Sequence, residues 1–166
     1  MKQLLLMRHA KSSWDVPGQS DLDRTLNERG KKDAPEMAHR IKKHGFKPQL
    51  FVCSPAKRTQ KTAKIVAEIL EYPENSIEQE TSMYNADISD LLYTIRTFND
   101  EHQRVMMIGH NPGFTSLIGI LTNSLLENLP TAGVALIRFD IKSWKQVAHH
   151  TGVLDWVDFP KSKDGD

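Results

Sequence analysis

The sequence has little that would assign it to an oxidising compartment, a membrane or nucleic acid. Its single cysteine, Cys53, has no second cysteine with which to form an internal disulfide. The formal net charge is only +1, so no excess of basic residues favours nucleic acid or an anionic membrane as a partner. The apolar run at residues 4–7 is shorter than the core of a signal peptide, and no stretch is long enough to span a bilayer. We therefore expect a cytoplasmic protein.

Length and composition predict one domain. A chain of 166 residues with 39% hydrophobic content can build one sizeable core but hardly two. We assign residues 1–157 to this domain. Proline, lysine, aspartate and glycine cluster in residues 158–166, and we expect these to form a flexible C-terminal tail. Because no long exposed apolar stripe is evident, we expect a monomer.

Short apolar runs alternate with segments of helical period, a pattern typical of an α/β fold with a mostly parallel central sheet. Strands are predicted at residues 4–7, 50–53, 77–80, 105–108 and 134–139, with an antiparallel partner within residues 147–156. One helix ends at Gly45, and Pro35 predicts that it starts or kinks there. Ser54 and Pro55 are expected to open a second helix as cap and first residue, a third is predicted at residues 89–98, and a fourth follows Pro112.

Three strand-to-helix junctions carry cationic or basic side chains. Arg8 and His9 follow the first strand, Lys57 and Arg58 follow the second, and His110 follows the strand at residues 105–108. The carboxyl ends of parallel strands share one edge of a sheet, which is where open α/β folds bind ligands. Two of the junctions also place a helix N-terminus there, which suits an anion. These side chains are therefore predicted to converge.

The residue types at this edge indicate a phosphoryl group. The guanidinium groups of Arg8 and Arg58 can give bidentate hydrogen bonds to tetrahedral oxygens and stabilise transition-state charge. A neutral imidazole is a competent nucleophile, and neighbouring arginines favour the neutral form. We therefore expect His9 to attack phosphorus while His110 donates hydrogen bonds to the equatorial oxygens.

Each feature also has a simpler explanation. Seen alone, the Arg8-His9 pair would be part of an ordinary surface loop. Residues 109–112 would be a tight turn before a helix, and Arg58 would be a solvated charge. Their joint occurrence at equivalent junctions favours the site. Histidines 39, 44, 102, 149 and 150 match no metal-ligand spacing, so we predict no metal and no cofactor. Trp14 either lines the mouth of the pocket or packs on the edge of the sheet.

Four segments together resemble the histidine phosphatase superfamily, which has the phosphoglycerate mutase-like fold, and within it the short SixA-like phosphohistidine phosphatases. They are residues 6–10 (Leu-Met-Arg-His-Ala), residues 24–30, residues 54–63 and residues 109–112. The resemblance implies a three-layer α/β/α sandwich and a metal-independent reaction through a phosphohistidine on His9. It makes Arg8, Arg58 and His110 the phosphate pocket, to which the short subgroup adds Arg24.

The roles of two candidate binding residues, and the identity of a general acid, stay open. Arg24 either lines the pocket or pairs with Asp21 and Asp23 at the surface. Asn111 either contacts substrate or only caps its helix. Many members of the superfamily supply a carboxylate acid from the loop after the third strand, whereas here Glu80 and Asp87 merely flank that loop. The lack of an obvious acid resembles the phosphohistidine-specific subgroup.

The sequence therefore predicts a phosphohydrolase that acts through His9, with phosphohistidine in a protein partner as the favoured substrate. Two alternatives stay open. One is a broad phosphomonoesterase for small phosphorylated metabolites, which would need an acid for its alcohol leaving groups. The other is a non-catalytic module that binds a phosphorylated ligand in the same pocket.

Overall fold

The computed structural model describes residues 1–160, whose strands form one six-stranded sheet. The strands are β1 (Lys2–Arg8), β2 (Leu50–Cys53), β3 (Glu78–Gln79), β4 (Arg104–Gly109), β5 (Val134–Phe139) and β6 (Gly152–Asp158). Their order in the sheet is β3-β2-β4-β1-β5-β6. The first four strands pair in parallel, and β5 pairs antiparallel with both β1 and β6. The predicted mostly parallel sheet and its antiparallel last strand are confirmed.

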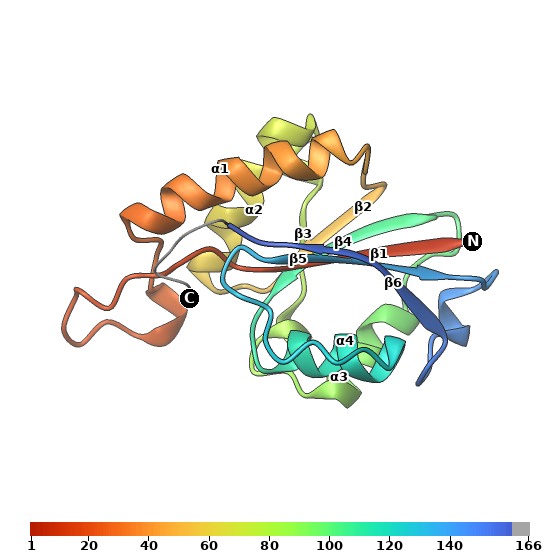
Figure 1. Ribbon diagram of the computed structural model, residues 1–166. Helices are drawn as coiled ribbons and strands as arrows, with labels where there is room; N and C mark the ends of the chain where they lie inside the picture. The colour runs from red at the N-terminus through yellow and green to blue at the C-terminus, as the bar shows by residue number, and fades with distance from the viewer. Residues whose placement is uncertain (161–166) are drawn as a thin grey trace.

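Helices cover both faces of the sheet, as the predicted α/β/α sandwich requires (Figure 1). The α-helices are α1 (Glu28–Lys43), α2 (Lys57–Leu70), α3 (Ile88–Arg96) and α4 (Gly113–Thr122). Short 3-10 helices are η1 (Asp21–Asp23), η2 (Glu74–Ser76), η3 (Thr81–Met83) and η4 (Trp144–Gln146). Helices α1 and α2 lie on one face, and α3 and α4 lie on the other. None of the helices within residues 1–160 is long and apolar enough to cross a membrane.

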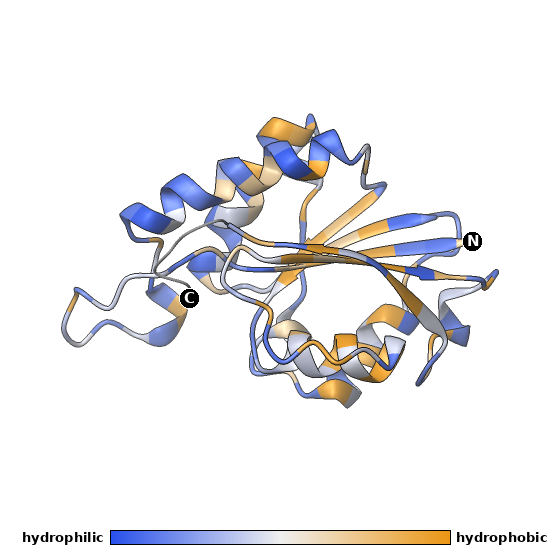
Figure 2. Ribbon diagram, viewed as in Figure 1, coloured by the Kyte–Doolittle hydropathy of each residue, from blue (hydrophilic) through white to orange (hydrophobic). Residues whose placement is uncertain are grey.

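The core lies on both sides of β1, because successive strand residues point to opposite faces. Leu4 and Leu6 pack with α3 and α4, while Leu5 and Met7 pack with α1 and α2, and all four are fully buried. Figure 2 shows the hydrophobic residues concentrated on the strands between the two helix layers. A strand covered on both faces has to be apolar throughout, which is why residues 4–7 form a continuous apolar run.

Two helices do not start at the residue where the sequence allows or predicts a start, Pro35 for the first and Pro55 for the second. Helix α1 begins at Glu28, where Asn27 caps it by accepting from the Gly30 N–H at 2.9 Å, and it continues through Pro35. The buried apolar face of α1 and this cap outweigh the hydrogen bond that proline cannot make. Helix α2 begins at Lys57 with Ala56 as its N-cap, so Ser54 is not the cap. The Ser54 hydroxyl instead lies 2.7 Å from His110 Nε2.

The ordered domain extends beyond its predicted end at residue 157. Asp158 is the last residue of β6, and Arg40 of α1 donates to both its carboxylate at 2.9 Å and the Phe159 carbonyl at 2.8 Å. Pro160 is buried. The start of the predicted tail is therefore part of the domain, and the rest of it, residues 161–166, lies outside the described residues.

Candidate active site

The three predicted junctions meet at one edge of the sheet. Arg8 ends β1 and lies in register with Gly109, which ends β4. The His9 N–H then donates to the Gly109 carbonyl at 3.0 Å, so the first and third junctions are held side by side. A cavity of about 690 Å³ opens at this edge, and its lining includes Arg8, His9, Trp14, Arg24, Arg58, Tyr84, His110 and Asn111. The structure therefore brings all six predicted site residues together.

His9 is held in one tautomer by the backbone of the next residue. Its ring Nδ1 lies 2.7 Å from the Ala10 carbonyl oxygen, which can only accept. The proton of the neutral ring is therefore on Nδ1, and Nε2 carries the lone pair. A ring that lines the cavity with an unprotonated Nε2 has the form that a nucleophile needs.

The environment of His9 strongly favours the neutral ring. Burial is the main cause that lowers the pKa of His9 to about 3; the Ala10 carbonyl opposes the shift, and the nearby His110, Arg58 and Arg8 add to it. The predicted influence of the arginines has the right sign, but desolvation is the larger cause. Sequence reasoning missed this because burial depends on the whole fold.

His110 stands beside His9, with a distance of 5.3 Å between the ring centroids. Its Nδ1 faces Arg58 Nη2 at 3.5 Å, and a guanidinium only donates, so the ring proton lies on Nε2 and points to the Ser54 hydroxyl. Burial and the Arg58 charge lower the pKa of His110 to about 4. In this state, the nitrogen that faces Arg58 accepts a hydrogen bond.

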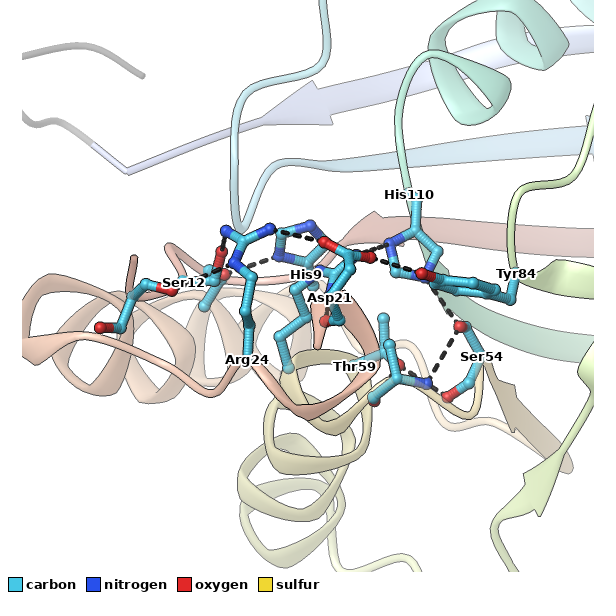
Figure 3. A network of polar contacts seen from close by, with 12 residues as sticks. His9, Ser12, Asp21, Arg24, Ser54, Thr59, Tyr84 and His110 are labelled. Carbon is cyan, nitrogen blue, oxygen red and sulfur yellow. Dashed lines mark hydrogen bonds and ion pairs between the residues drawn. The ribbon is translucent and has the colours of Figure 1, made fainter. Parts of the chain in front are cut away.

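One carboxylate holds two of the arginines. Asp21 Oδ1 accepts from Arg24 Nη1 at 2.9 Å, and Asp21 Oδ2 accepts from Arg58 Nη2 at 3.0 Å. The Tyr84 hydroxyl also donates to Oδ2, at 2.5 Å. Figure 3 shows the Asp21 carboxylate between the Arg24 guanidinium and the Tyr84 ring. Arg58 and Arg24 are therefore already ion-paired around the cavity.

Arg24 both lines the cavity and pairs with an aspartate, so each of its two predicted roles is partly correct. Arg24 pairs with Asp21, yet it is buried and lines the cavity, so this is no surface ion pair. Its guanidinium also lies 3.2 Å from the centre of the Trp14 ring and donates to Ser12 Oγ. Trp14 is 76% exposed and lines the cavity, which places it at the mouth of the pocket.

The other two predicted residues also line the cavity, and both are tied to one loop. Arg8 Nη1 donates to the Leu129 carbonyl at 3.1 Å. Asn111 Nδ2 donates to Asn128 Oδ1 and to the Leu129 carbonyl, each at 3.0 Å, while its Oδ1 accepts from the Thr115 N–H at 3.2 Å. Asn111 therefore binds the first turn of α4 and the loop at residues 128–129, although the N-cap residue of α4 is Pro112.

The sequence profile of the histidine phosphatase superfamily (branch 1) matches residues 4–104, well over half of the chain. The chain belongs to this superfamily. His110 lies beyond the matched residues, so its place in the pocket rests on the geometry described above.

Solved structures of this superfamily share the fold over nearly the whole chain. The protein histidine phosphatase SixA complexed with tungstate aligns with a TM-score of 0.81 at 22% identity, covering 95% of this chain and 97% of that one. A candidate phosphohistidine phosphatase SixA from Agrobacterium tumefaciens aligns with a TM-score of 0.79 at 28% identity, covering 96% and 98%. The phosphoglycerate mutase-like fold is thus confirmed.

The sequence relatives differ in how much of the chain they match. An uncharacterized chloroplastic protein of Arabidopsis thaliana is 29% identical over 93% of this chain and 74% of its own length. Phosphoserine phosphatase 1 of Hydrogenobacter thermophilus is 41% identical, but the match covers 41% of this chain and 32% of that protein. This chain therefore matches only about a third of a relative whose substrate is named.

The loop after β3, where many members of the superfamily carry a carboxylate acid, contributes a tyrosine to the cavity. Tyr84 lines the cavity and meets His110 edge-on, with 5.7 Å between ring centroids. Asp87 also lines the cavity, but its Oδ1 caps α3 by accepting from the Asp90 N–H at 2.9 Å. Glu80 precedes η3, where its own N–H donates to the Cys53 carbonyl at 2.9 Å.

Three residues of the site were missed or misjudged from the sequence: Asp21, Ser54 and Tyr84. The only signal was the spacing of Asp21 and Arg24, which predicts an ion pair but not its burial. Among residues 1–160, no group of three or more His, Cys, Asp or Glu side chains is arranged to hold a metal ion.

Proposed function

We propose that this protein is a phosphatase that transfers a phosphoryl group to His9 and then to water, and that its substrate is phosphohistidine in a protein or a related phosphorylated compound. The observation that carries the proposal is the His9 tautomer. Its Nδ1–H donates to the Ala10 carbonyl, so Nε2 keeps its lone pair, and the ring lines a cavity together with Arg8, Arg58 and His110.

The reaction has two steps. The Nε2 lone pair of His9 attacks phosphorus, and the P–N bond to the substrate imidazole breaks with its electron pair returning to that ring. The substrate imidazole leaves as a neutral ring because its other nitrogen carries a proton. Water then adds to phosphorus, the Nε2–P bond breaks, and phosphate leaves with the protons of the water. The Ala10 carbonyl stabilises the positive charge on phosphorylated His9, and the arginines bind the phosphoryl oxygens.

The acid–base groups of the site favour a P–N substrate. An alkoxide leaving group needs a proton donor, whereas a protonated imidazole does not. The pKa of Asp21 is lowered, chiefly by the hydrogen bond from Tyr84, so this carboxylate is ionised and cannot donate a proton. The same hydrogen bond raises the pKa of the Tyr84 hydroxyl, which makes it a weaker acid.

A second candidate is a phosphomonoesterase for small phosphorylated metabolites. The partial match to phosphoserine phosphatase 1 of Hydrogenobacter thermophilus favours it. Under either reading we propose a metal-independent, monomeric, cytoplasmic enzyme without nucleic-acid or membrane partners. Comparing hydrolysis of a phosphohistidine peptide with that of phosphoserine separates the two candidates, because the first predicts the faster reaction for the P–N bond.

The decisive experiment traps the intermediate. The protein is incubated with a ³²P-labelled phosphohistidine peptide, quenched in alkali and tested for a protein-bound label that is stable in base and labile in acid. We expect the label in the wild type and in His39→Ala, an exposed histidine on α1, and none in His9→Ala. No label and no released phosphate would refute the phosphatase. Binding of phosphate without turnover would instead favour the non-catalytic module.

A further inference from the structure

Asp21 is the unexpected charged group of the site. Its carboxylate is held by three side chains that line the cavity, namely Arg24, Arg58 and Tyr84, at 2.9, 3.0 and 2.5 Å. Its backbone carbonyl also accepts from Arg58 Nη1 at 2.7 Å. Tyr84 comes from the loop after β3 and Asp21 from η1, so the carboxylate is fixed from several elements at once.

The carboxylate lies close to the position of a bound phosphoryl group. Arg58 Nη2 is shared between Asp21 Oδ2 at 3.0 Å and His110 Nδ1 at 3.5 Å. A phosphoryl group that contacts Arg58 and His110 therefore lies within a few ångströms of Asp21. The Asp21 side chain is still 43% exposed, so its charge also acts on whatever part of a substrate extends towards solvent.

Two of the cations that line the cavity are already paired with Asp21. Arg24 and Arg58 line the cavity, and the Asp21 carboxylate accepts from both of them. A second anionic group on the substrate, next to the phosphoryl group, would therefore meet the negative charge of Asp21.

We propose that Asp21 determines substrate choice by disfavouring leaving groups that carry a negative charge and favouring neutral or cationic ones. This inference rests on the proposed function and names its substrate class more closely. A protonated phosphoimidazole carries positive charge on the ring that leaves, so Asp21 attracts it. A phosphorylated carboxylic acid carries a second negative charge, which Asp21 repels.

Binding of phosphonates tests the inference without requiring turnover, because their P–C bond is not hydrolysed. The dissociation constants of benzylphosphonate and 4-carboxybenzylphosphonate are measured by calorimetry at low ionic strength. We expect the wild type to bind the carboxylated compound more weakly. Asp21→Asn should narrow the ratio of the two constants by about threefold to tenfold, and the effect should shrink in high salt.

Matched variants distinguish charge from position. Asp23→Asn makes the same charge change two residues away, where the carboxylate pairs with exposed Lys57 at 3.5 Å, and it should leave the ratio unchanged. Asp21→Glu keeps the charge and should keep the preference. If Asp21→Asn does not fold, the wild type decides alone, because it should prefer 4-(aminomethyl)benzylphosphonate to the carboxylated compound, and more so in low salt.

The outcomes separate this inference from the phosphatase itself. An unchanged ratio in folded Asp21→Asn, an equal change in Asp23→Asn, or no binding of either phosphonate by the wild type would overturn it. Selective binding without hydrolysis of any phosphorylated substrate would leave the inference standing and refute the phosphatase. Hydrolysis without selectivity would do the reverse.

Discussion

The two histidines of the site are kept neutral chiefly by burial. Both lie against guanidinium groups, yet desolvation is the first cause of the lowered pKa of each. The Ala10 carbonyl only accepts, so it keeps the proton of His9 on Nδ1, and the Arg58 guanidinium only donates, so it keeps the proton of His110 on Nε2. The charge of each ring is thus set by the fold, and its tautomer is set by one neighbouring group.

Protein stability should depend on pH through His9. Its pKa is about 3 in the folded protein, below the unfolded value of about 6.5. Between these values the unfolded chain binds more protons, so the free energy of unfolding falls as the pH falls below about 6.5. Between pH 7.5 and pH 5, we expect the free energy of unfolding to fall by about 1–2 kcal/mol less in His9→Asn than in the wild type.

Urea denaturation at both pH values measures this difference. His39→Asn, which changes an exposed histidine, should behave as the wild type does. An equal loss in His9→Asn and the wild type would mean that His9 is not held neutral by the fold.

Ser54 should support the tautomer of His110 that the Arg58 guanidinium selects, because its hydroxyl can accept from Nε2–H. The serine is fully buried, and its hydroxyl lies 2.7 Å from His110 Nε2, so Ser54→Ala leaves that N–H without its partner. We expect kcat with an aryl phosphate to fall about tenfold, as for a lost hydrogen bond of about 1.4 kcal/mol, with a smaller change in KM. Nitrogen-15 spectra of the His110 ring should show the proton redistributed.

The control for this prediction is Ser116→Ala, which removes an exposed hydroxyl from the lining of the same cavity. Its kcat and its His110 spectrum should match the wild type. A lower kcat in Ser54→Ala with an unchanged His110 spectrum would show that Ser54 acts by packing alone.

At the scale of elements, buried strands were predictable, as were the starts of α3 and α4, but the starts of α1 and α2 were not. Residues 50–53 and 134–139 match β2 and β5 because a strand covered on both faces must be apolar throughout. The start of α1 depends instead on packing. Its buried face and the Asn27 cap carry the helix past Pro35, and neither the extent of that burial nor its strength can be read from local sequence.

The same contrast applies to the site. His9, Arg58 and His110 were predictable because strand order brings junctions of parallel strands to one edge. Asp21 and Tyr84 were not, since they are 63 positions apart and meet only through the loops that flank the cavity. No periodicity records such a contact.

The close approach of α1 to the His9 loop should make Gly30 hard to replace. A Cβ at this position would lie 2.2 Å from the Lys11 carbonyl oxygen, which belongs to the backbone two residues after His9. We expect Gly30→Ala to reduce the free energy of unfolding by about 1–3 kcal/mol, as overpacking does, and to lower kcat because the His9 loop must move.

Gly119→Ala should change the free energy of unfolding in the opposite direction. Gly119 lies in α4, and the nearest atom to its added Cβ would be the Ser124 carbonyl oxygen at 3.9 Å, an ordinary contact. Alanine there should raise stability by about 0.5–1 kcal/mol. Thermal unfolding of both variants gives the comparison, and equal stability of Gly30→Ala and the wild type would contradict the close packing of α1.

At the scale of the whole molecule, the site depends on segments from most of the chain. The loop after β1, the start of α2, the loop after β3 and the loop after β4 all contribute to one cavity. No single segment can bind a phosphoryl group by itself, so an anion that binds there stabilises only the folded chain.

Inorganic phosphate should therefore raise the global stability of the protein. At 100 times its dissociation constant, phosphate should add about 2.7 kcal/mol to the free energy of unfolding. Arg58→Lys keeps the charge but loses the planar guanidinium, so the same phosphate concentration should stabilise it less than the wild type. Arg138→Lys changes an arginine that pairs with Asp155 between β5 and β6, outside the cavity, and phosphate should stabilise it as much as the wild type. Urea titrations with phosphate, each matched by sodium chloride of equal ionic strength, measure this gain. An equal gain from chloride would contradict a specific site, because general screening of charge would then explain the stabilisation.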